Sequence, residues 1–198
     1  MYKEVKIDIG GGQRAEYFVG LASHDRSSLY VVLDPQKFRC LYVNIYPNLR
    51  LMRWGSGRTI DGNNWELPFQ DATVDHAYLN NIYGVMDEVK LPYLVGKRTE
   101  SQDDKEIYSR IVSSLRRVMK PSGVVHVKET QVLLGIVQQI YLESGFRITG
   151  GPKVTAEEEY TPTSFLLSKF VEEDVRKYGV SNPMESMYLP MELTAVLG

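Results

Sequence analysis

The chain has 198 residues, of which 43% are hydrophobic and 24% are charged, and its 23 basic and 25 acidic side chains give a formal net charge of −2. This length is typical of one domain whose core needs no disulfide or metal staple. A single cysteine, Cys40, excludes an internal disulfide framework and a cysteine-based zinc site. The charge balance gives no overall attraction to nucleic acid. We therefore expect one domain over 1–198, with residues 179–198 as a tail.

The chain shows neither the apolar core of a signal peptide at its start nor a stretch of ~20 apolar residues that would cross a bilayer. These features predict a cytoplasmic protein without a membrane partner. The tail carries Met184, Met187, Leu189 and Met191. It is apolar enough to dock either on the domain's own core or on an oligomeric partner.

Strand and helix patterns alternate along the chain. Apolar runs or period-two alternation predict strands at 5–9, 29–33, 49–52, 74–79, 124–127, 146–149 and 165–170. Helical spacing of apolar residues predicts helices at 13–22, 104–119, 131–143 and 171–178, the third stopped by Gly145. Residues 55–64 are expected to form a loop and Pro121-Ser122-Gly123 a turn. Such alternation predicts an α/β fold with a parallel sheet covered on both faces.

The segment VKIDIGGGQR at 5–14 is the strongest local signal. A strand runs into Gly10, Gly11 and Gly12 and then into a helix, and Asp8 places a carboxylate at the strand's exit. Glycines at such a bend let a ligand approach the backbone, and the helix start offers unpaired N–H groups. A tight turn without a ligand explains the glycines equally well.

Asp34 closes the second predicted strand, 22 residues after Gly12. A carboxylate at about this spacing from a glycine turn binds the hydroxyls of a ribose. The alternative is a helix N-cap before Pro35; both roles are compatible, but the spacing and the position at the strand end favour the ribose role.

Four segments in order resemble the class I S-adenosylmethionine-dependent methyltransferases. They are the glycine turn with Asp8, then Asp34, then ELPFQDATVD at 66–75, and then LRRVMKPSGVVHV at 115–127. Within the last two, the matching residues are Leu67, Pro68, Phe69, Asp71 and Asp75, and Lys120, Pro121 and Gly123. The resemblance covers residues 5 to about 170. It implies a doubly wound, mostly parallel, seven-stranded Rossmann-like sheet with an antiparallel last strand, here 165–170.

The resemblance also implies S-adenosylmethionine as the cofactor and methyl transfer to an unidentified acceptor as the activity. Asp8, Gly10, Gly11, Gly12 and Asp34 would bind the cofactor. Asn80 follows the fourth strand, where the family lines its cofactor and substrate pocket, although capping of the next helix is an equal alternative. For the residue that contacts the adenine amino group, counting leaves Asn63 and Ser56, and Asn63 is preferred because its side-chain carbonyl can accept a hydrogen bond.

The sequence departs from the family pattern at several points. Arg14 stands where the family has its third glycine, and because the first strand is predicted at 5–9, the N-terminal covering helix of the family is not expected in 1–198. Asn80-Asn81-Ile82-Tyr83 lacks both prolines of the amine-methylating tetrad. Lys128 and Glu129, at the exit of the fifth strand, are possible substrate contacts.

Two other functions fit parts of this pattern. A nicotinamide-dependent oxidoreductase would use Gly10, Gly12 and Ala15 as its fingerprint and Asp34 as its ribose acid, but it gives no role to the two later motifs. A methyltransferase-like scaffold without catalysis is the other alternative, and it would show no saturable cofactor binding.

Overall fold

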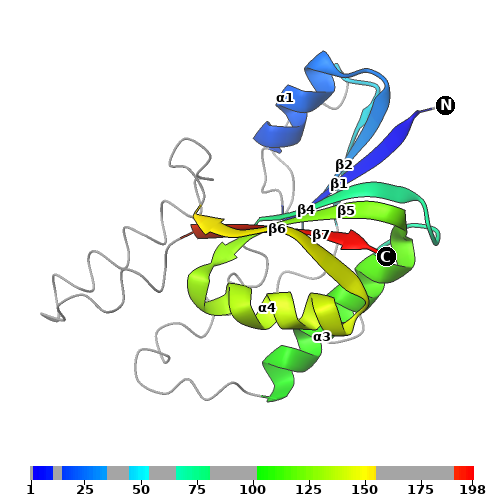
Figure 1. Cartoon of the computed structure of the whole chain (residues 1–198). Helices are drawn as coiled ribbons and strands as arrows, with labels where there is room; N and C mark the ends of the chain where they lie inside the picture. The colour runs from blue at the N-terminus through cyan, green and yellow to red at the C-terminus, as the bar shows by residue number, and fades with distance from the viewer. Residues whose placement is uncertain (1, 11–14, 35–44, 54–65, 81–101, 155–189) are drawn as a thin grey trace, which may run out of the picture.

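The structure is a computed structural model that describes residues 2–10, 15–34, 45–53, 66–80, 102–154 and 190–198. In this part of the chain, seven strands form one sheet in the order β3-β2-β1-β4-β5-β7-β6 (Figure 1). The strands are β1 (Glu4–Ile9), β2 (Ser28–Asp34), β3 (Leu49–Arg53), β4 (Val74–Asn80), β5 (Met119–Thr130), β6 (Phe146–Val154) and β7 (Pro190–Leu197). The described helices are α1 (Glu16–His24), α3 (Gln102–Val118) and α4 (Gln131–Glu143). None of these helices is long and apolar enough to span a membrane.

The sheet confirms the predicted fold class. The strands β3, β2, β1, β4 and β5 pair in parallel, and β7 runs antiparallel to both β5 and β6. The prediction of the antiparallel strand at 165–170 is wrong, because this strand is β7 at 190–197, inside the predicted tail; residues 165–170 lie outside the described part. This half of the tail therefore packs in the domain's own sheet.

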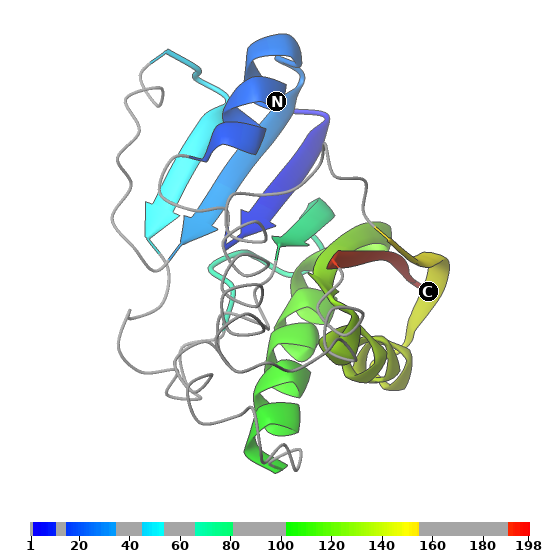
Figure 2. The same cartoon turned by 90° about the vertical axis from the view of Figure 1, so that its left-hand side faces the viewer.

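Helices lie on both faces of the sheet (Figures 1 and 2), and each face carries a buried apolar cluster. On one face, α3 and α4 pack against residues such as Ile7, Ala77, Val125 and Leu193 in the larger buried cluster. On the other face, α1 covers β2 and β3, with Phe18 in the smaller cluster. Side chains of a strand alternate between faces, so each odd-numbered core residue of β1, β4 and β5 faces the helix pair.

The predicted turn at Pro121-Ser122-Gly123 is instead part of β5. The strand begins directly after α3, and its pairing with β4 shifts register between Val74 and His76. Ser122 lies at the irregularity with a φ of 63°. An added Cβ at Gly123 would lie 2.9 Å from the carbonyl oxygen of Lys120. A bulge thus absorbs the turn residues without ending the strand.

The helix predicted at 13–22 runs from Glu16 to His24. It begins after Ala15, which has a left-handed φ of 53°. The helix predicted at 131–143 has these same bounds, and Gly145 follows it with a φ of 85°, as expected of a glycine after a helix end. The predicted loop at 55–64 and helix at 171–178 lie outside the described residues.

Candidate functional site

The carboxyl ends of β1 and β2 form the centre of the candidate site. Asp8 lies two residues before Gly10, whose φ of 78° is in the region that favours glycine. The N–H of Gly10 donates to the carbonyl oxygen of Leu33 at 2.8 Å. The glycine turn therefore starts directly beside Asp34, the last residue of β2.

The two carboxylates that the sequence singled out are both buried. Asp8 is 1% exposed and Asp34 is 6% exposed. Asp8 is the register partner of Val32, and Asp34 lies two residues after Val32 on β2, so all three side chains project from the same face of the sheet. Val32 belongs to the smaller apolar cluster, so this is the face that α1 covers. Buried carboxylates at strand ends can accept hydrogen bonds from ligand hydroxyls and favour a ligand with positive charge.

The remaining predicted residues divide between this edge and the undescribed part of the chain. Asn80 is the last residue of β4 and the register partner of Lys128 on β5, so its backbone lies at the same carboxyl edge. Glu129 follows, fully buried. Gly11, Gly12 and Asn63 lie outside the described residues, as do Arg14, Ser56 and 81–83.

The helix-cap role predicted for Asp34 depends on Pro35 and the residues after it, which lie outside the described part of the chain. The register partner of Asp34 on β3 is Arg53.

Sequence reasoning missed an aromatic row beside this site. Tyr17, in the first turn of α1, lies 5.8 Å from Tyr78 between ring centroids, and Tyr78 stacks on His126 at 4.6 Å with 15° between the ring planes. His126 stacks in turn on His76 at 6.0 Å. The contributing segments are far apart in sequence, and only the strand register brings these rings together.

Burial shifts the pKa values of three side chains in this row. It raises the pKa of Tyr78 to about 12, so the phenol stays protonated at neutral pH. It lowers the pKa of both His76 and His126, and for His126 the positive charge of protonated His76 lowers it further. The two imidazoles are therefore neutral near pH 7.

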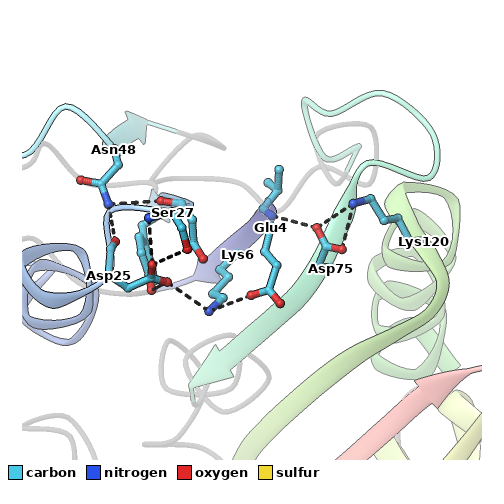
Figure 3. Close-up of polar contacts among 10 residues, drawn as sticks. Glu4, Lys6, Asp25, Ser27, Asn48, Asp75 and Lys120 are labelled. Carbon is cyan, nitrogen blue, oxygen red and sulfur yellow. Dashed lines mark hydrogen bonds and ion pairs between the residues drawn. The ribbon is translucent and has the colours of Figure 1, made fainter. Parts of the chain in front are cut away.

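The opposite, amino edge of the sheet holds a polar network (Figure 3). Asp75 accepts two contacts from Lys120 Nζ, at 2.8 and 2.9 Å, and one from the N–H of Val5 at 2.8 Å. Nearby, hydrogen bonds from Ser28 and Ser27 hold the pKa of Asp25 well below its usual range. Asp75 and Lys120, which belong to the motifs of the resemblance, thus join β1, β4 and β5.

The Leu-Pro-Phe segment is likewise fixed to α3. Arg117 donates to the carbonyl oxygens of Leu67 at 2.7 Å and Phe69 at 2.9 Å, and it pairs with Asp71 at 2.8 Å. The N–H of Leu67 donates to Ser114 Oγ at 2.8 Å. These contacts give the described part of the motif a structural role.

The strand order, with an antiparallel β7 between β5 and β6 and with helices on both faces, is that of the class I methyltransferase fold, as the resemblance predicts. Comparison of the sequence with family models and with curated proteins finds no match.

Several solved structures share this fold. The antibiotic-resistance methyltransferase Kmr aligns with a TM-score of 0.56 at 15% identity, over 100% of this chain and 88% of that chain. The 16S rRNA methyltransferase KamB aligns with a TM-score of 0.55 at 15% identity, over 100% of this chain and 89% of that chain. The [4+2]-cyclase SpnF aligns with a TM-score of 0.55 at 13% identity, over 99% of this chain and 76% of that chain. Because one of these proteins is described as a cyclase, the fold alone does not fix the reaction.

Proposed function

We propose that the protein is an S-adenosylmethionine-dependent methyltransferase that acts in the cytoplasm. The observation that carries the proposal is the pair of buried carboxylates, Asp8 and Asp34, beside the left-handed Gly10 at the carboxyl edge of a methyltransferase-type sheet. In open α/β sheets, ligands bind outside the carboxyl ends of the strands, where the strand order reverses. Here the order reverses between β1 and β4.

The residues present fit this cofactor. Asp34 would accept hydrogen bonds from the ribose hydroxyls, and Gly10 leaves room for close approach to the backbone. The negative charge of Asp8 and Asp34 suits a sulfonium cation. When bound, the cofactor supplies an activated methyl group.

The protein's part in the reaction would be mainly positioning. Holding the acceptor and the cofactor in line supplies much of the rate of a reaction of this kind. A general base is needed only for an acceptor that must lose a proton, and we assign none.

Calorimetric titration with S-adenosylhomocysteine tests the proposal. We expect saturable binding to the wild type and a loss of about tenfold or more in Asp34→Ala, because hydrogen bonds to a charged group contribute ~1.5–3 kcal/mol each. Asp71→Ala is the matched control, since its side chain is 75% exposed and should leave the affinity unchanged.

Each alternative predicts a different outcome. If Asp34 is only a helix cap, Asp34→Ala should lower the stability by about 1 kcal/mol and keep the affinity. A scaffold would show no saturable binding to the wild type. An oxidoreductase would bind NADH in preference to S-adenosylhomocysteine.

A further inference from the structure

The aromatic row starts with an exposed ring. Tyr17 is 54% exposed, whereas its neighbour Phe18 is fully buried. The Tyr17 ring lies 5.8 Å from the Phe18 ring at an interplanar angle of 35° and meets Tyr78 edge-on at 61°. Single exposed hydrophobic side chains are common on protein surfaces, but this one is held against two other rings.

The row begins next to the candidate cofactor site. Tyr17 follows the glycine turn by only a few residues, and Tyr78, which it contacts, is the register partner of Asp8. Register partners on neighbouring strands project from the same face. Tyr17 therefore lies on the same side of the sheet as the Asp8 carboxylate, near the carboxyl end of β1.

The neighbouring ring contacts restrict the Tyr17 side chain. Rigid tyrosines lose little conformational entropy when they bind, because they have only two side-chain torsions. Here Phe18 and Tyr78 restrict the ring further, and Tyr78 is itself held by its stack on His126 at 4.6 Å. An exposed, preorganised ring face is suited to stack on another planar ring.

We propose that Tyr17 contacts the methyl acceptor by stacking and that the acceptor carries a heteroaromatic ring, such as a nucleobase. This inference rests on the proposed function, since it places the acceptor beside the cofactor. The ring can come from a free nucleoside or from a single-stranded nucleic acid. Tyr17 is thus assigned as a substrate-contacting residue that transfers no proton.

The test uses the full chain saturated with S-adenosylhomocysteine, so that added nucleosides do not occupy the cofactor site. Free nucleosides and a short single-stranded RNA of mixed sequence are titrated calorimetrically into the wild type, Tyr17→Ala and Tyr17→Phe. We expect the affinity of Tyr17→Ala for at least one probe to fall about fivefold or more, since loss of one stacked ring has effects of this order. Tyr17→Phe should stay close to the wild type. Tyr2→Ala is the control. Tyr2 is also a partly exposed tyrosine, at 38%, but its hydroxyl donates to the carbonyl oxygen of Pro47 and it is not part of the aromatic row.

The outcomes separate this inference from the proposed function. A wild type that does not bind S-adenosylhomocysteine overturns both. If it binds S-adenosylhomocysteine but none of the ring probes, or binds them equally in Tyr17→Ala, the inference is wrong and the proposed function stands. Loss of nucleoside binding in Tyr17→Ala identifies a small acceptor, and loss confined to RNA identifies a nucleic acid.

Discussion

Replacing Asp75 with alanine tests how the amino edge of the sheet is held together. The Asp75 carboxylate accepts one hydrogen bond from the partly buried N–H of Val5 and two contacts from Lys120. The Lys120 side chain is 40% exposed, so its ion pair contributes only ~0–1 kcal/mol. Leaving the N–H of Val5 without its acceptor costs ~1–3 kcal/mol. We therefore expect Asp75→Ala to lower the free energy of unfolding by about 2 kcal/mol.

Urea unfolding followed by circular dichroism measures this loss. For a chain of this size, 1 kcal/mol corresponds to ~2–4 °C in the thermal midpoint, so a drop of about 4–8 °C should accompany it. Asp75→Asn keeps an oxygen for the N–H of Val5 and should lose about half as much. Lys120→Met keeps the aliphatic stem and should lose less than about 1 kcal/mol.

The reasoning would be refuted if Lys120→Met destabilised the protein as much as Asp75→Ala, because the ion pair would then dominate. The same variants address function as well. Asp75 lies at the amino edge, away from the candidate site, so Asp75→Ala should bind S-adenosylhomocysteine as the wild type does. A loss of affinity at a temperature where the variant is folded would show that this motif reaches the cofactor site.

Three further predictions concern stability. Gly135→Ala, in the middle of α4 with nothing within 4 Å of an added Cβ, should raise the free energy of unfolding by ~0.5–1 kcal/mol in urea titrations. Gly123→Ala should lower it and reduce the thermal midpoint, because the new Cβ would crowd the Lys120 carbonyl. The folded state lowers the pKa of His126, so its contribution to stability is present above the unfolded value of ~6.5 and is lost as the pH falls below it. Thermal midpoints between pH 8 and pH 5 should therefore fall less in His126→Gln than in the wild type; equal slopes in the two proteins would contradict this.

The sequence predicted the parallel part of the sheet well because its strands show either a continuous apolar run, as in β2, or an alternation of apolar and polar residues, as in β1. The run Leu29–Leu33 is buried on both faces, and such strands are recognised by composition alone. β7 was missed because its apolar residues are interrupted by polar ones and a more apolar segment precedes it in the sequence. In it, Leu193 and Ala195 are buried whereas Glu192 and Thr194 are half-buried. The segment at 165–170 is more apolar and therefore gives the stronger strand signal in the sequence.

The candidate site was predictable only where it depends on spacing along one segment. Asp8, Gly10 and Asp34 follow from a strand, a turn and the next strand, and the structure brings them to one edge. The contact of Tyr17 with Tyr78 depends instead on which strands are neighbours. Because β4 follows β3 in the sequence but pairs with β1, no local pattern reports it.

The position of β7 has a consequence for the order of folding. In the described sheet β6 pairs with no strand except β7, and β7 is the strand that joins it to β5. β6 therefore precedes β7 in the sequence, and within the described sheet its backbone is paired only after residues 190–197 have been placed. Pairing between segments so far apart in the sequence is slow, because the entropy lost when the two segments are brought together opposes it before any contact forms. The last strand of the chain is thus inserted between β5 and β6 rather than added at an edge of the sheet. A change that prevents β7 from pairing with β5 would also detach β6 from the rest of the sheet.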